Sequence, residues 1–246
     1  MDSFKLGLCS VTFRKKSAEE IVEIAKKNRV DFIEWGGDVH VRNIEDARHV
    51  KDLCDKANIK ISSYGSYYNT AAPDLSKWEE ICKISNEMGA SSVRIWLGKK
   101  NSENFDSDEY IRTVEHLRKL CDTAAEYDLM ICPECHDNTF NNKTDAFLKL
   151  KKDLQRNNFR TYFQSRYYRM EYDLDRIDRT FDYIENVHVS YRDLKKEQLF
   201  RKKDYRYIDK ILNKLKSMSF KGIVMIEFVD FANEYALSND IRKLKK

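Results

Sequence analysis

Short β-rich runs alternate along this chain with longer segments whose apolar residues recur at helical spacing. The first run, residues 5–13, is followed by a helical segment that begins near Ser17, where Ser17 and Glu20 form a capping-box pattern. Strands that alternate with helices imply parallel strands joined by crossover helices. The expected strands are residues 5–13, 30–35, 59–64, 92–97, 129–135, 159–164, 187–189 and 223–229.

Eight such units fill the 246 residues almost completely. A closed (β/α)8 barrel has about 250 residues, so the length favours this α/β fold, a TIM barrel. Neither the dinucleotide-binding glycine motif nor a P-loop follows any expected strand, which removes the usual reason for an open nucleotide-binding sheet. We therefore expect residues 1–246 to form a single TIM-barrel domain.

Composition narrows the function classes. Lys and Arg number 45 against 41 Asp and Glu, and the charges are interleaved, so no nucleic-acid partner is expected. No apolar run approaches the ~18 residues that span a bilayer, and the N-terminus lacks the pattern of a signal peptide. We expect a cytoplasmic protein that does not bind membranes.

The Cys132–Cys135 pair ends a strand-like run without a second metal-binding pair, so we interpret both residues as buried thiols.

Four polar residues stand at the ends of consecutive expected strands, where a parallel barrel builds its site. Singly, each has an ordinary explanation: Glu134 as a helix cap, Gln164 as a surface residue, His188 as a core histidine and Glu227 as part of a salt bridge. Burying a carboxylate such as Glu227 in an apolar run costs several kcal/mol unless it is paired or binds a cation. Together the four suit a divalent ion, with Mn²⁺ or Mg²⁺ favoured and Zn²⁺ or Co²⁺ also compatible.

The chain resembles the sugar phosphate isomerase/epimerase family of xylose isomerase-like barrels, which also contains inosose dehydratases and ketose 3-epimerases. The most specific stretch is Glu-Trp-Gly-Gly-Asp-Val-His, residues 34–40. Shorter motifs extend the resemblance over nearly the whole chain, at residues 7–13, 63–68, 93–96, 133–136 and 226–229.

The resemblance implies a metal held by Glu134, Gln164, His188 and Glu227. It further implies that Glu134 and Glu227 are catalytic and pass a proton on opposite sides of the substrate carbon. Gln164 stands where the family usually has Asp. Two carboxylates in place of three should bind the ion more weakly but leave it a stronger Lewis acid. If the sixth strand is shifted in register, a neighbour such as Tyr162 takes this place.

Strands one to four would supply the rim that binds a small carbohydrate. Trp35 and Trp96 can stack on a sugar, although core packing is an equal alternative. Arg94 lies between Val93 and Ile95, so its side chain points opposite to theirs. If it points into the barrel it is suited to bind an anion, and if it points toward the helices it is suited to form a salt bridge. Hydroxyl or phosphate groups can also be bound by His40, Tyr64 and His136.

The resulting hypothesis is a metal-dependent isomerase or epimerase of a sugar, sugar phosphate or related polyol ketone. A non-catalytic sugar-binding barrel with a decayed metal site is the alternative from another class. A dehydratase on the same fold also remains open. An endonuclease IV-like hydrolase is disfavoured because its zinc cluster needs many histidines and the chain has 5. Barrels of this kind often pair, so a homodimer is a possible assembly.

Overall fold

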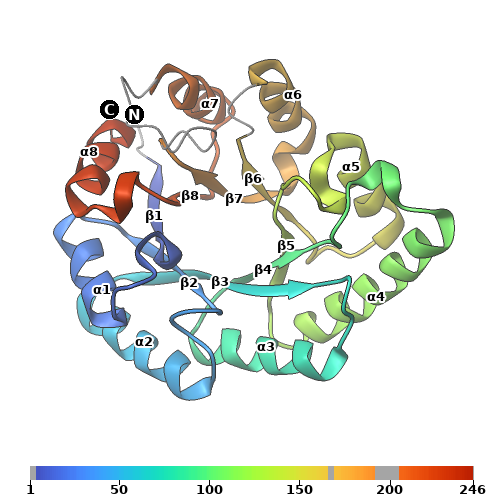
Figure 1. Ribbon diagram of the computed structural model, residues 1–246, viewed down its shortest axis with the longest axis horizontal. Coiled ribbons are helices and arrows are strands. Elements are labelled where there is room, and N and C mark those ends of the chain that lie inside the picture. Colours follow the sequence, from blue (N-terminus) through green and yellow to red (C-terminus); the bar gives the residue numbers. More distant parts are fainter. Residues whose placement is uncertain (1–3, 166–168, 192–204, 246) are drawn as a thin grey trace.

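Eight parallel strands surround a central axis in the computed structural model, which describes residues 4–165, 169–191 and 205–245 (Figure 1). The sheet order is β5-β4-β3-β2-β1-β8-β7-β6. Isolated bridges, Ile131 with Phe159 and Glu134 with Tyr162, join the two edges, so the barrel is nearly closed and the predicted fold is confirmed. The strands are β1 (Lys5–Cys9), β2 (Phe32–Gly36), β3 (Lys60–Asn69), β4 (Ser92–Trp96), β5 (Met130–Pro133), β6 (Thr161–Gln164), β7 (Ile184–Val189) and β8 (Ile223–Ile226).

Helices cover the outside of the barrel (Figure 1). The predicted capping box is present at the first of them: Ser17 Oγ accepts the Glu20 N–H at 3.3 Å, and a Glu20 carboxylate oxygen accepts the Ser17 N–H at 2.8 Å. The helices are α1 (Ala18–Lys27), α2 (Ile44–Ala57), α3 (Leu75–Glu87), α4 (Ser107–Ala125), α5 (Thr144–Leu154), α6 (Met170–Thr180), α7 (Tyr205–Ser217) and α8 (Glu234–Leu244).

The expected strands differ from the observed ones at their ends, and the first and third differ most. The run at 5–13 is a strand only to Cys9, because residues 10–13 turn into a 3-10 helix. β3 continues past Tyr64 to Asn69, with a break in register against β4 between Gly65 and Tyr68. Such irregularities re-aim side chains at the rim of a barrel.

Apolar side chains form two separate layers. The larger lies between the strands and the helices, and a smaller cluster fills the barrel interior with Cys9, Val11, Cys132, Tyr162, Ile223 and Met225. Gly7 makes room for this cluster, since a Cβ atom there would lie 2.4 Å from Cγ of Met225. The interior is thus packed with side chains, and polar groups gather at the carboxyl ends of the strands.

Among the described helices, none has the length and apolar character needed to cross a membrane.

Candidate active site at the carboxyl ends of the strands

Five charged or titratable side chains meet inside the barrel near the carboxyl ends of the strands, each at most 6% exposed. Alternation along the strands directs them inward while their apolar neighbours pack against the helices. They are Glu34 on β2, Arg94 on β4, Glu134 after β5, His188 on β7 and Glu227 after β8.

Arg94 connects two of the carboxylates. Its Nε donates to Oε1 of Glu34 at 3.1 Å, and its Nη1 donates to Oε2 of Glu134 at 2.5 Å. Burial is the largest single influence and would raise the pKa of each carboxyl group, but the charge of Arg94 and the interactions with His188 together outweigh it. The pKa of Glu134 falls to about 2, and that of Glu34 lies well below its usual range. Both carboxylates are therefore ionised at neutral pH.

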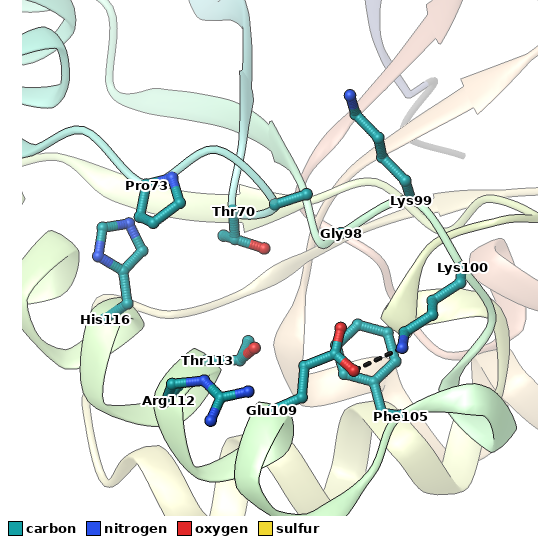
Figure 2. Close-up of a pocket in the computed structure, with 11 residues that line it drawn as sticks. Thr70, Pro73, Gly98, Lys99, Lys100, Phe105, Glu109, Arg112, Thr113 and His116 are labelled. Carbon is teal, nitrogen blue, oxygen red and sulfur yellow. Dashed lines mark ion pairs between the residues drawn. The ribbon is translucent and has the colours of Figure 1, made fainter.

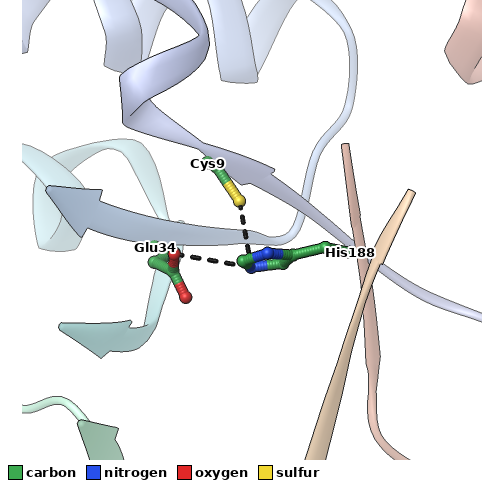
Figure 3. Close-up of side chains that lie close together, drawn as sticks. All are labelled: Cys9, Glu34 and His188. Atoms are coloured by element: carbon green, nitrogen blue, oxygen red, sulfur yellow. Dashed lines mark hydrogen bonds and ion pairs between the residues drawn. The ribbon is translucent and has the colours of Figure 1, made fainter. Parts of the chain in front are cut away.

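His188 stands between two pairs of groups. Its Nδ1 lies 3.4 Å from Oε2 of Glu227 and 3.8 Å from Oε1 of Glu134. Its Nε2 lies 3.4 Å from Sγ of Cys9 and 3.5 Å from Oε1 of Glu34, and Figure 3 shows both groups directed at the ring. Burial opposes a charge on the imidazole, yet Cys9, Glu227 and Glu34 together raise the pKa of His188 well above its ordinary value. Burial also raises the pKa of the Cys9 thiol to about 12.

Glu227 is held by the backbone on both sides. Its N–H donates to the Val189 carbonyl at 2.9 Å. The next residue, Phe228, has a left-handed φ of 63°, and its N–H donates to Oγ1 of Thr12 at 3.0 Å. A non-glycine residue in this region is strained and needs such support. The turn brings the strand to an end where the Glu227 side chain faces His188.

The donor atoms around Nδ1 fit a divalent ion. Nδ1 is buried and has no hydrogen-bond partner among the described residues, which is unusual for a buried polar atom. Ligand bonds of about 2.0–2.2 Å separate neighbouring ligand atoms by roughly 3.0–3.7 Å, and the distances from Nδ1 to the two carboxylates lie close to this range. Glu134, His188 and Glu227 offer ligand atoms that all lie within 4.8 Å of one another.

Gln164 ends β6 opposite His188 in the register of β6 and β7. It stands two residues after Tyr162, whose ring packs edge-on against the His188 ring at 4.9 Å. Alternation therefore places the Gln164 side chain on the interior face as well. Its Oε1 is buried without a hydrogen-bond partner in the described part of the chain. It is an amide oxygen available as a further ligand.

Two of the expected rim residues lie elsewhere. Trp35 is fully buried in the layer between strands and helices, and Tyr64 lies in the same layer with its hydroxyl donating to the Val41 carbonyl at 2.8 Å. Neither is among the residues that the barrel gathers near His188. Both lie one position from an inward-facing residue, so alternation turns them outward.

The other expected rim residues differ in their surroundings. The ring nitrogens of His40 lie 3.0 Å from Oγ of Ser10 and 3.2 Å from the Lys16 carbonyl oxygen, so the chain itself occupies them. Trp96, the last residue of β4, and His136, which follows β5, pack on each other with ring centroids 4.7 Å apart. Both side chains are partly exposed, and Nδ1 of His136 lies 2.7 Å from the Asp137 carbonyl oxygen.

Sequence reasoning assigned no role to Glu34 and treated Cys9 only as an apolar residue. Glu34 interrupts the apolar run Phe32-Ile33-Glu34-Trp35, just as Glu227 interrupts the run of β8. The argument about the cost of burying a carboxylate applies equally to both. That signal was present in the sequence. Nothing comparable marks Cys9, because a cysteine in an apolar strand is most often a core residue.

A separate cavity of about 340 Å³ lies outside the barrel, between the segments that follow β3 and β4 and helix α4 (Figure 2). Its basic side chains are Lys99, Lys100 and Arg112, and Lys100 is paired with Glu109 at 2.6 Å. None of the charged residues around His188 lines this cavity. It is therefore a different surface from the candidate active site.

Comparisons with known proteins agree with this geometry. The sequence model of the xylose isomerase-like TIM barrel family matches residues 22–246. A 3-dehydroshikimate dehydratase of Bacillus anthracis is 25% identical over 170 residues, which are 63% of this chain and 60% of that protein. The chain thus matches about three fifths of that relative's length.

Solved structures show the same fold. A probable 3-DHS dehydratase from Bacillus anthracis superimposes with a TM-score of 0.82 at 17% identity, covering 98% of this chain and 99% of that one. A D-psicose 3-epimerase from Clostridium cellulolyticum H10 superimposes with a TM-score of 0.74 at 15% identity, covering 98% and 96%. At these sequence identities the structural similarity supports only the assignment of the fold.

Proposed function

Because this chain belongs to the xylose isomerase-like TIM barrel family, we propose that it is a metal-dependent isomerase or epimerase of a sugar, sugar phosphate or related polyol ketone. The observation that carries the proposal is Nδ1 of His188, which has no hydrogen-bond partner among the described residues and faces the carboxylates of Glu134 and Glu227 at the carboxyl end of the barrel. A buried polar atom without a hydrogen-bond partner is suited to bind an ion or molecule that is not part of the chain.

Glu134, Gln164, His188 and Glu227 would hold the ion. Three oxygen donors and one nitrogen favour Mn²⁺ or Mg²⁺, and Zn²⁺ or Co²⁺ is also compatible. When bound, such an ion polarises a substrate carbonyl and stabilises the negative charge that develops on its oxygen.

The two glutamates carry the proton transfers in this proposal. One carboxylate removes the proton from the carbon next to the carbonyl. The other glutamate, as the protonated carboxylic acid, donates a proton to the opposite face of that carbon in epimerisation, or to the adjacent carbon in isomerisation. Arg94 occupies Oε2 of Glu134, so Oε1 is the oxygen of Glu134 that faces His188 and the site.

Solvent deuterium exchange tests this proposal. The purified protein is incubated in D₂O with a panel of ketoses and ketose phosphates, with and without Mn²⁺, and deuterium incorporation is measured by mass spectrometry. We expect Mn²⁺-dependent exchange into at least one sugar, abolished by Glu227→Gln. The matched control is Glu185→Gln, at the other end of β7 in a partly exposed pair with Arg160, which should exchange at the wild-type rate.

A second candidate is favoured by the Bacillus anthracis relative, whose name states that it dehydrates 3-dehydroshikimate. Elimination of water next to a carbonyl begins with the same removal of a proton by a carboxylate, and then a hydroxyl group leaves from the neighbouring carbon. The panel therefore includes 3-dehydroshikimate, with loss of water followed by mass spectrometry. Dehydration without exchange into any ketose would replace the isomerase proposal by a dehydratase.

The alternative of a sugar-binding barrel without catalysis makes opposite predictions. Protein purified without chelators would then contain far less than one divalent ion per chain and would gain none on addition of Mn²⁺. It would also show neither exchange nor dehydration. That combination of results would overturn the enzymatic proposal.

A further inference from the structure

The Nε2 side of His188 has its own set of buried groups, which the proposed reaction does not use. Oε1 of Glu34 lies 3.5 Å from Nε2, and Sγ of Cys9 lies 3.4 Å from it on another side (Figure 3). Glu34 and Cys9 are both almost fully buried. The two ring nitrogens of His188 therefore face different partners, with Glu134 and Glu227 on one side and Glu34 and Cys9 on the other.

Glu34 is held firmly in this position. Its Oε2 accepts a hydrogen bond from Oγ of Ser63 at 2.9 Å, and its Oε1 accepts one from Nε of Arg94 at 3.1 Å. These contacts come from β3 and β4, the two strands that follow β2 in the sheet. The same guanidinium also binds Glu134, so one residue fixes a carboxylate on each side of the imidazole.

A metal ion binds a lone pair of the imidazole, so an ion at Nδ1 requires that nitrogen to have lost its proton and leaves the single N–H of the ring on Nε2. An ionised carboxylate accepts hydrogen bonds and donates none. A carboxylate beside Nε2 consequently favours the tautomer with the proton on Nε2 and the lone pair on Nδ1. Metal-binding histidines commonly have their other nitrogen oriented in this way.

We propose that Glu34 is a positioning residue that keeps the proton of His188 on Nε2 and so directs the Nδ1 lone pair toward Glu134 and Glu227. The inference rests on the proposed metal site, because that site gives the lone pair its role. Glu34 acts through His188 in this proposal and is not one of the four proposed ligands.

Two other interpretations of the same cluster are less well supported. Cys9, Glu34 and His188 offer three metal-ligand atoms, but Nε of Arg94 lies 3.1 Å from Oε1 of Glu34, and its positive charge opposes a cation at that oxygen. Cys9 is a neighbour of Nε2 as close as Glu34, yet a neutral thiol is only a weak acceptor. Glu34 is therefore the stronger of the two groups that can orient the ring.

The test compares Mn²⁺ affinities, measured from the electron paramagnetic resonance signal of free Mn²⁺. Glu34→Leu removes the acceptor at similar size and should weaken Mn²⁺ binding about 10–100-fold. Glu34→Gln keeps an acceptor oxygen and should recover most of that loss. Cys9→Ser is the matched control on the other neighbour of Nε2 and should bind Mn²⁺ as the wild type does.

A second measurement needs no change at Glu34. In ¹⁵N-labelled wild-type protein loaded with Mg²⁺, the His188 signals, assigned from their loss in His188→Asn, should show a protonated Nε2 and an unprotonated Nδ1. A proton on Nδ1 would overturn the inference even if Glu34→Leu failed to fold.

The remaining outcomes are equally decisive. The role of Glu34 would be refuted if the wild type binds Mn²⁺ and Glu34→Leu binds it equally well. It would also be refuted if Cys9→Ser weakens Mn²⁺ binding as much as Glu34→Leu does. In both cases the proposed function would still stand. If the wild type binds a second equivalent of Zn²⁺ and Cys9→Ser abolishes that binding, the cluster of Cys9, Glu34 and His188 would be a metal site instead. Absence of binding of Mn²⁺, Mg²⁺, Zn²⁺ and Co²⁺ alike by the wild type would remove both the proposed function and this inference.

Discussion

Arg94 is the buried cation on which the stability of the candidate site depends, and replacing it gives the sharpest prediction. Its guanidinium is 2% exposed and binds Glu34 and Glu134, which are equally buried. Arg94→Met keeps an unbranched side chain but leaves two carboxylates without their cation. Removing one partner of a buried ion pair costs about 3–5 kcal/mol, so we expect at least this loss in the free energy of unfolding at neutral pH.

The loss should depend on pH in a defined direction. In the wild type, the lowered pKa of Glu134, about 2, contributes stability that is present above about pH 4.3 and disappears as the pH falls toward 2. Without Arg94, burial raises the pKa values of the two carboxyl groups instead. The two buried carboxyl groups are then neutral in the folded protein, and the free energy of unfolding falls as the pH rises and they ionise. The difference between variant and wild type should thus be largest near neutral pH and shrink toward about pH 5.

Urea denaturation followed by circular dichroism measures this difference at about pH 5 and about pH 7.5. A loss of about 4 kcal/mol lowers the midpoint by roughly 1.5 M urea if the slope is about 2.5 kcal/mol per M. The matched control is Arg48→Met, which breaks an exposed pair with Glu87 and should leave the midpoint unchanged. An equal loss at both pH values, or a loss of less than about 1 kcal/mol at each, would refute the reasoning.

Three further results are expected. Gln164→Asp adds a carboxylate beside the proposed ion and should tighten Mn²⁺ binding about tenfold; unchanged affinity in a Mn²⁺ titration would remove Gln164 from the set of ligands. Gly65→Ala places a Cβ atom 2.8 Å from Nη2 of Arg94 and should destabilise the protein by about 1–3 kcal/mol, which an unaltered urea midpoint would contradict. Burial raises the pKa values of Cys82 and Cys121 to about 12, so at about pH 8 these thiols stay neutral and should resist iodoacetamide until urea unfolds the chain. Mass spectrometry of the native protein would disprove this by finding either residue alkylated.

Hydrophobic periodicity in the sequence was sufficient to predict the barrel, because that signal is local. Each β-rich run and each helical stripe can be recognised within about ten residues, and their alternation leaves few topologies for eight units. The candidate ligands Glu134, His188 and Glu227 followed from the same logic. A polar residue that ends or interrupts an apolar strand has no packing reason to be there, and parallel strands bring their carboxyl ends together.

Beyond the signal at Glu34, it was the tertiary structure that decided which way the residues of β2 to β4 face and which partners they meet. Both faces of a parallel barrel strand are buried, so its sequence is apolar on both sides and does not mark the inner one. Trp35 and Tyr64 consequently proved to face the helices, while Glu34 and Arg94 face the interior. The network that joins Arg94 to two carboxylates, both of them beside His188, links residues 34, 94, 134 and 188. Only closure of the barrel brings residues so far apart in the sequence to hydrogen-bonding distance.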